Sequence, residues 1–507
     1  MNTMSQALPS DHYRASALHH QPPRLAIPFA EQHTPPLAIG AFTDQVSREL
    51  ALRNLVLSAA FCLLVVAGVG PAASSAQASV GSALMQVPSA AQQDHSIAPS
   101  ATSESSPLMY VSSYTLPPDK YAKARHLARI DYVAGILLPL YGLLILYLLL
   151  RWGWSAKFRD WAEAVSSWRI LQAAVYTAAF NAVVALLKLP IGMWFHWLYR
   201  KNDLVIQGWG SWFGDRSKMI LITTVIATIV VFAGAAIIRR SPRRWWLYFW
   251  LGSIPFLIII IFLTPLVIDP LFNKFEPLAG YDAQLVNDLQ RVVHRDGLEI
   301  PPQRMFLMKA SEKVKFVNAY VSGLGGSKRV VVWDTTIAKM TRPQILYVFG
   351  HEMGHYVLNH IYKGLIAGTV GLLVCFFLTA AISRRWLERH SAAWRIRGPA
   401  DCAALPVYAI PILLLTFVST PISNALSRYY EHQADQYGLE VTHGLTPDSG
   451  QIAAQSFQIL GEIDLEDPAP NRVEILWYWD HPWIGDRIQF ALHYDPWANG
   501  GTGEFVK

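Results

Sequence analysis

Six long apolar runs limit most strongly what this chain can fold into. Each run lacks Asp, Glu, Lys and Arg, and each is close to the roughly 20 residues that an α-helix needs to cross a hydrocarbon core about 30 Å thick. The runs are Tyr132–Leu150, Ile170–Leu187, Met219–Ile238, Trp245–Ile268, Gly364–Ser383 and Cys402–Leu426. With a shorter run at Leu55–Gly70, they predict a mainly α-helical, multi-pass integral membrane protein with about seven spanning helices.

The shorter run, Leu55–Gly70, is open to two interpretations. The segment after it, 71–78, is rich in Ala and Ser and resembles a signal-peptidase site. A signal peptide, however, begins a chain, and about fifty residues precede this run. We favour a retained helix, with a cleaved segment as the alternative.

The composition supports a membrane protein and excludes other classes. Charged residues make up 15% of the chain, where a soluble globular domain has about 25%, and hydrophobic residues make up 52%. The net charge of +6 is modest, and the basic residues cluster between the apolar runs, so no nucleic-acid partner is expected. Three distant cysteines, Cys62, Cys375 and Cys402, form neither a disulfide framework nor a zinc ribbon.

The apolar runs also divide the chain into regions. We expect a disordered extension, a membrane region that includes an Ala- and Ser-rich loop at 73–118, and a peptidase-like region that two further spans divide into two parts. The expected boundaries are 1–54, 55–268, 269–363, 364–426 and 427–507. Any chemistry on one side of the membrane must therefore combine two pieces of chain that a membrane hairpin separates.

The strongest chemical signal is the pentapeptide H-E-M-G-H at 351–355. On a helix, positions i and i+4 share a face, so His351 and His355 can both bind one zinc ion. Glu352, beside them, is placed to take a proton from the attacking water. Chance gives about 0.04 occurrences of this motif in such a composition, which argues against two ordinary surface histidines.

The residues before the motif are typical of a helix start. Thr341 can cap the helix, Gln344 can reach back to it as a capping box, and Pro343 falls in the first turn.

A third metal ligand is expected after the last apolar run. Residues 424–435 place Asn, Ser, Arg, Glu and Asp on one helical face that continues the membrane helix. We expect Glu431 to be the third ligand, and Asp435, one turn later, to orient a ligating imidazole. The alternative is an interfacial helix with solvated charges, because spacing alone does not bring Glu431 to His351.

These motifs resemble the type I CAAX prenyl endopeptidase family of integral-membrane zinc proteases. The resemblance rests on H-E-M-G-H, two spans, and then N-x-x-S-R-x-x-E-x-x-A-D. It extends to 270–278 and 318–330 and covers roughly residues 120–490. It implies a seven-helix barrel around a water-filled chamber and a gluzincin-like zinc peptidase region with one zinc ion. It also implies hydrolysis near the carboxyl termini of proteins, which in eukaryotes are prenylated.

Two further sites are expected beside the zinc helix. Phe316–Val321 and Arg329–Trp333 are strand-like and flank a Gly-rich turn, so they predict a small β-hairpin. Its edge can bind substrate backbone by strand addition, with Asn318 and Ala319 nearest the scissile bond. A purely structural hairpin is the alternative.

The tail carries the second of these sites. His481 can donate a hydrogen bond to the oxyanion of the reaction, as the resemblance implies for the matching histidine. Arg487, six residues later, is assigned to substrate binding. A structural role for a lone histidine is the alternative.

Orientation in the membrane is left open by the sequence. The loops Arg239–Arg244 and Arg384–Arg397 carry four and five Arg, so the positive-inside rule makes them cytoplasmic and places the zinc region outside. The family resemblance implies the opposite, and we favour a site that opens to the cytoplasm. The expected location is a bacterial inner membrane or the endoplasmic reticulum, depending on the host.

Two functions from different classes fit these observations. One is a membrane-embedded zinc metalloendopeptidase with protein or peptide substrates, membrane-associated or prenylated ones among them. The other is a non-catalytic scaffold or transporter with a vestigial zinc helix. We favour the enzyme, because His351, Glu352, His355 and Glu431 are all present.

Overall fold

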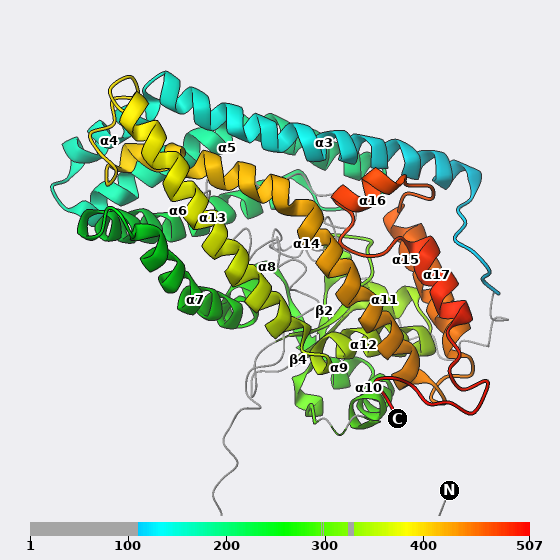
Figure 1. Cartoon of the computed structure of the whole chain (residues 1–507). Coiled ribbons are helices and arrows are strands. Elements are labelled where there is room, and N and C mark those ends of the chain that lie inside the picture. The colour runs from blue at the N-terminus through cyan, green and yellow to red at the C-terminus, as the bar shows by residue number, and fades with distance from the viewer. Residues whose placement is uncertain (1–109, 296, 298, 323–328) are drawn as a thin grey trace, which may run out of the picture. The chain divides into compact units, whose positions relative to one another are not determined.

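The computed structural model describes residues 110–507 except 296, 298 and 323–328 (Figure 1). The extension 1–54, the run Leu55–Gly70 and most of the 73–118 loop lie outside the described residues. Within these ranges the chain is mainly helical, as expected.

Six helices are long and apolar enough to cross a membrane, and together they contain all six predicted runs. Their main helices are α3 (Pro118–Arg151), α5 (Arg169–Lys201), α6 (Trp209–Arg240), α7 (Trp245–Leu263), α13 (His360–His390) and α14 (Leu405–Thr442). The span that contains α7 continues to Phe272, and the span that contains α14 begins at Cys402. A π-helical turn (Thr264–Ile268) joins α7 to α8 (Asp269–Phe272). Most of these helices are longer than the predicted runs, because helical structure continues into the polar residues that flank each run. The 34 residues of α3, for example, span about 51 Å, well beyond a hydrocarbon core of about 30 Å.

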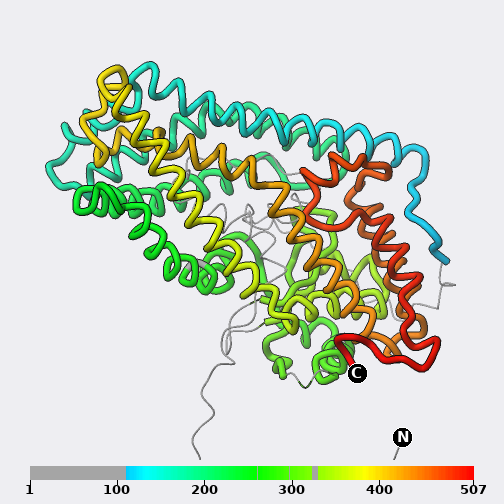
Figure 2. The backbone as a smooth tube through the Cα atoms, in the orientation of Figure 1, coloured from blue at the N-terminus to red at the C-terminus, as the bar shows by residue number. Residues whose placement is uncertain are grey.

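The membrane helices form a closed ring. Contacts run from α14 to α3, from α3 through α4 (Trp154–Val165) to α5, and then through α6, α7 and α13 back to α14. Figure 2 traces the backbone through these helices. The ring agrees with the expected barrel, and a water-filled chamber inside it stays a prediction.

The peptidase region is built on a small mixed sheet with the strand order β1-β2-β4-β3. Its strands are β1 (Phe275–Pro277), β2 (Met305–Met308), β3 (Ala319–Ser322) and β4 (Arg329–Trp333). The predicted hairpin is present as β3–β4, with Ala319 opposite Val332. The sheet is larger than predicted, because β2 pairs with β4 in parallel and β1 pairs with β2.

Shorter helices surround the sheet, and one of them, α12, carries H-E-M-G-H. They are α9 (Leu278–Tyr281), α10 (Ala283–Arg295), α11 (Asp334–Lys339), α12 (Arg342–Val357), α15 (Ser449–Asp464), α16 (Arg472–Tyr478) and α17 (Ile484–His493). Single 3-10 turns lie at Pro302–Arg304, Ala310–Glu312 and Cys402–Ala404. Helices α10, α14 and α15 all contact α12, so the motif helix lies inside this region.

Long-range contacts join the parts of this region. Buried Glu440 of α14 accepts hydrogen bonds from the backbone N–H groups of residues 504–506 at 2.6–3.0 Å. At the other end of the described chain, the backbone N–H groups of Val111 and Thr115 donate to Gln451 and Gln458 of α15, each at 3.1 Å. The predicted boundary at 426–427 falls inside α14, which runs unbroken from the membrane into the peptidase region.

Candidate active site

The motif helix α12 begins as the sequence predicts. The backbone N–H of Thr341 donates to Oε1 of Gln344 at 2.8 Å, and Pro343 lies in the first turn. The helix ends at Val357, and Asn359 then takes a left-handed conformation with φ of 57°. This break starts α13 at His360, directly beside the end of the motif.

Two glycines allow α12 and α14 to pack closely. A Cβ on Gly354 would lie 2.8 Å from Cβ of Tyr437, and a Cβ on Gly438 would lie 3.0 Å from the backbone nitrogen of His351. Distances this short force neighbouring atoms to move. Glycine at these positions therefore lets the carboxylates of α14 approach the imidazoles of α12.

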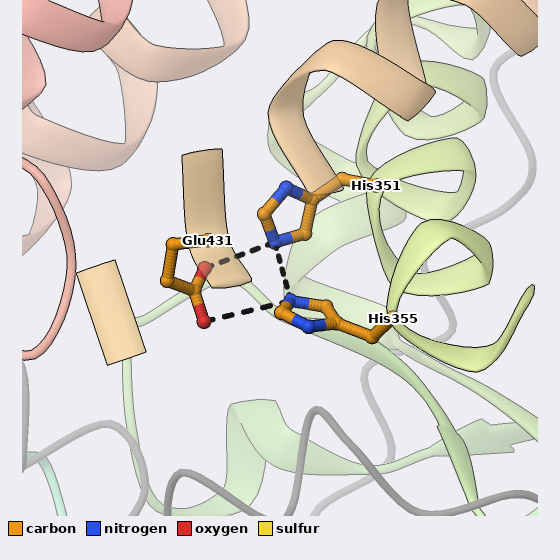
Figure 3. A group of neighbouring side chains, drawn as sticks. All are labelled: His351, His355 and Glu431. Carbon is orange, nitrogen blue, oxygen red and sulfur yellow. Dashed lines mark hydrogen bonds and ion pairs between the residues drawn. The ribbon is translucent and has the colours of Figure 1, made fainter. Parts of the chain in front are cut away.

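Three side chains converge at this contact (Figure 3). The Nε2 atoms of His351 and His355 are 3.1 Å apart. Glu431 brings its two carboxylate oxygens to 3.2 Å from Nε2 of His351 and 3.5 Å from Nε2 of His355. One ligand atom from each residue lies within 4.8 Å of the others, and all three residues are buried. The structure thus brings together the three residues that the sequence predicts as metal ligands.

The geometry fits a bound metal ion. Two ligand nitrogens of a tetrahedral zinc lie about 3.3 Å apart, given Zn–N bonds of about 2.0–2.1 Å. Within the described residues, neither carboxylate oxygen of the fully buried Glu431 has a hydrogen bond of ordinary geometry. Because a buried carboxylate needs opposite charge close to it, a metal ion between these atoms would suit the arrangement.

Asp435 orients the first imidazole. Its carboxylate lies 2.8 Å from Nδ1 of His351, and because a carboxylate only accepts, Nδ1 donates and Nε2 is the nitrogen that would bind a metal. Arg487 donates two hydrogen bonds to the same carboxylate, at 2.8 and 2.6 Å. Burial opposes a charge on His351, but the hydrogen bonds and charges of Asp435 and Glu431 raise its pKa to about 10. The two carboxylates therefore favour positive charge beside them, which a bound metal ion would supply.

A second series of hydrogen bonds, from Gln433 through His360, orients His355. Nδ1 of His355 lies 3.1 Å from Nδ1 of His360, and Nε2 of His360 lies 3.1 Å from Oε1 of Gln433. Since the amide oxygen only accepts, His360 donates from Nε2, accepts at Nδ1, and leaves Nε2 of His355 available for a metal. His360 and Gln433 were not predicted from the sequence. The signal for His360 was a histidine five residues after His355, at the start of an apolar run.

A cavity of about 160 Å³ opens beside this group. Glu352 lines it, and so do Asn318 from the segment just before β3 and His481 from the tail. Tyr132 of the membrane helix α3 also lines it, so the cavity borders a spanning helix. Seven of the nine predicted site residues thus line one cavity: His351, His355, Glu431, Glu352, Asn318, His481 and Arg487.

His481 is held against the metal group from two sides. Its Nδ1 lies 2.9 Å from Oδ1 of Asp480, and its Nε2 lies 3.3 Å from Oε2 of Glu431. Burial opposes its charge, but the carboxylates of Glu431 and Asp480 raise its pKa to about 9. Arg428 fixes the preceding segment by donating to the backbone carbonyls of Ile475 and Trp479. The polar face of α14 therefore helps to position His481 as well as carrying Glu431.

The remaining predicted residues have clear positions. Ala319 is the first residue of β3, which lies at the edge of the sheet within the described chain, and it is fully buried. Arg487 lines the cavity, but two of its nitrogens bond to Asp435 and its guanidinium packs over Phe457 at 4.2 Å. Arg487 therefore holds the carboxylate of Asp435 in place. Its role in substrate binding stays a prediction.

Comparison with known proteins agrees with this geometry. The family description "Peptidase family M48" matches residues 281–495, and "CAAX prenyl protease N-terminal, five membrane helices" matches residues 104–274. The crystal structure of Ste24p from S. mikatae superposes with a TM-score of 0.64 at 21% identity, covering 74% of this chain and 89% of that chain. This likeness confirms the predicted fold.

Relatives in sequence support the same assignment. The chain is 34% identical to the uncharacterized metalloprotease YhfN of Bacillus subtilis, over 68% of this chain and 79% of that protein. It is 24% identical to CAAX prenyl protease 1 of Saccharomyces cerevisiae, over 64% and 73% of the two chains. It is 23% identical to the human CAAX prenyl protease 1 homolog, over 67% and 77%. The chain therefore belongs to peptidase family M48 and is a multi-pass integral membrane metallopeptidase.

Proposed function

We propose that the chain is a zinc-dependent endopeptidase whose metal is held by His351, His355 and Glu431. The observation that carries this proposal is the convergence of two imidazole nitrogens and one carboxylate within 4.8 Å. Two nitrogens and one oxygen are a typical catalytic zinc set, with a fourth position left for water. Softer metals favour sulfur and harder metals favour oxygen alone, so this donor set favours zinc.

Glu352 is the proposed general base. When bound, zinc lowers the pKa of water towards 7 and polarises the scissile carbonyl. Glu352 lines the same cavity and follows His351 directly, so it can take the proton from the attacking water. It then passes this proton to the leaving nitrogen of the peptide bond.

His481 and the edge of β3 are the proposed substrate contacts. The imidazole of His481 faces the cavity, is held by Asp480 and carries a raised pKa, so it can donate to the developing oxyanion. Asn318 lines the cavity at the start of the edge strand, where a substrate can add as a further strand. Asn318 and Ala319 are thus proposed to hold the backbone near the scissile bond.

The proposed substrates are membrane-associated proteins or peptides, prenylated ones among them. The cavity borders α3, so a substrate anchored in the bilayer can reach the metal group without leaving the membrane surface. Several relatives carry the name CAAX prenyl protease, which supports a cleavage site near a carboxyl terminus. A non-catalytic scaffold is not favoured, because the base and all three ligands converge on one cavity.

Metal analysis of the purified full-length protein tests the proposal. We expect near-stoichiometric zinc in the wild type and a strong loss of zinc in His351→Ala, His355→Ala and Glu431→Ala. His390→Ala is a matched control, because this exposed histidine lies at the far end of α13. Absence of zinc from an active wild-type preparation, or zinc retained at wild-type affinity in Glu431→Ala, contradicts the proposal.

A further inference from the structure

Positive charge is concentrated at the end of the helical ring that lies away from the metal group. Three connections meet there: 151–169, 239–244 and 384–401 (upper left in Figure 1). We call them the arginine-rich end. They contain thirteen Arg and Lys but only four Asp and Glu, a surplus of nine positive charges in a chain whose net charge is +6.

A cavity of about 380 Å³ lies in the arginine-rich end. It is bounded by the start of α5, the last turns of α6 and the connection between α13 and α14. Four arginines line it: Arg159, Arg169, Arg239 and Arg397. We call this cavity the arginine pocket.

Two of these arginines are neutralised by carboxylates of the protein. Arg159 is buried and lies 2.6 Å from Asp401. Arg397 forms a paired contact with Glu163, at 2.7 and 2.8 Å. These contacts connect α4 to the α13–α14 connection and shape the wall of the pocket.

The other two arginines have no such partner. Within the described part of the chain, neither Arg169 nor Arg239 has a carboxylate at ion-pair distance. Both are exposed, and both line the arginine pocket. They give the pocket two positive charges that the protein does not balance, in a geometry suited to an anion with several oxygens.

An exposed apolar stripe on α6 leads to these charges. Leu221, Val225, Ile229 and Phe232 follow at helical spacing and are 65%, 53%, 52% and 37% exposed. Because exposed apolar side chains on a membrane helix are suited to acyl chains rather than to water, we take this stripe as a lipid-facing surface. Phe232 also lines the arginine pocket, so the pocket joins a lipid-facing surface to a cationic rim.

A second, apolar crevice continues from the pocket. It shares six lining residues with the pocket, Val231 and Ala235 among them, and extends between α6, α7 and α14. Its further wall includes Gly234, Trp245 and Phe249. A free phosphate ion gains nothing from contact with this apolar surface, whereas an acyl chain is stabilised there because both surfaces leave water.

We propose that the arginine pocket binds an anionic phospholipid, with its phosphate between Arg169 and Arg239. The acyl chains lie along the exposed stripe of α6 and in the crevice beside Val231. Basic pockets between membrane helices recognise anionic headgroups in this way, because the charges meet at the membrane–water boundary. The site is separate from the metal group and goes beyond the proposed peptidase function.

The test compares phospholipids on the purified full-length protein. Bound lipid is measured by native mass spectrometry after exchange with phosphatidylglycerol or phosphatidylcholine, and inorganic phosphate is added in a third series. We expect a clear preference for phosphatidylglycerol in the wild type. Arg169→Gln with Arg239→Gln should reduce this preference on the order of thirtyfold, about fivefold for each arginine.

The matched control is Arg243→Gln with Arg244→Gln. It removes the same charge from exposed positions of the arginine-rich end that do not line the pocket. It should keep the wild-type preference, and Arg169→Lys with Arg239→Lys should keep most of it. Zinc content near wild type in every variant shows that the protein is folded. Equal loss in the control variant, no preference in the wild type, or displacement of the lipid by inorganic phosphate alone would overturn the proposal.

Discussion

The carboxylate of Asp435 lies 2.8 Å from Nδ1 of His351, one helical turn after the carboxylate of Glu431. A single face of α14 therefore carries both a proposed metal ligand and a carboxylate that bonds to another proposed ligand. This relationship depends on the close contact between α12 and α14.

Asp435→Asn should weaken zinc binding by about 10–100-fold, because the amide removes the negative charge beside His351 and leaves Arg487 without its carboxylate. Competition with a chelator of known affinity measures the change. Asp119→Asn, at an exposed position in the first turn of α3, is the control and should bind zinc normally. Unchanged affinity in Asp435→Asn would mean that the carboxylate does not orient His351.

His360→Ala should weaken zinc binding about tenfold or more, because Nδ1 of His355 then loses its acceptor. His360→Asn should restore much of the affinity, since its amide oxygen can accept at a similar position. The same chelator competition compares the two variants. If His360→Ala and His360→Asn behaved alike, the residue would be needed only for packing against Tyr430.

Gly354→Ala should destabilise the protein by about 1–3 kcal/mol and lower its zinc content. The new Cβ would lie 2.8 Å from Cβ of Tyr437, so α12 and α14 would have to separate. Gly364→Ala is the matched control, because a Cβ there has no heavy atom within 4 Å. Thermal unfolding of both variants in the same detergent decides the point, and equal melting temperatures would contradict the role given to the helix contact.

The sequence predicted many of the residues that the structure brings together at this site. Charge-free runs predicted the six described spans, since a bilayer leaves no alternative to apolar helices of that length. The i, i+4 spacing predicted His351 and His355, and a helical face predicted Glu431. His360 and Gln433 were missed because their roles depend on the break at Asn359 and on a long-range approach of α14. Neither feature leaves a periodic pattern.

The sheet shows the same limit. Alternation and turn residues predicted the local β3–β4 pair, but the parallel pairing of β2 with β4 joins distant segments. Such pairings depend on the packed region around α12 rather than on neighbouring residues.

His481→Ala should lower turnover by about 10²–10³-fold with little change in KM, because its hydrogen bond is strongest when the oxyanion carries charge. Zinc content should stay near wild type. His493→Ala is the control, since this exposed histidine bonds to a carbonyl of its own helix, that of Gln489. Wild-type turnover per zinc-loaded molecule in His481→Ala would exclude the residue from the active site.

The most direct measurement is peptide hydrolysis by Glu352→Gln, with zinc content determined on the same preparation. The substitution keeps the shape of the side chain and removes the base, so chemistry should suffer far more than folding. We predict near-stoichiometric zinc together with a turnover less than about a tenth of the wild type. A zinc-loaded Glu352→Gln protein that hydrolyses peptides at the wild-type rate would contradict the account.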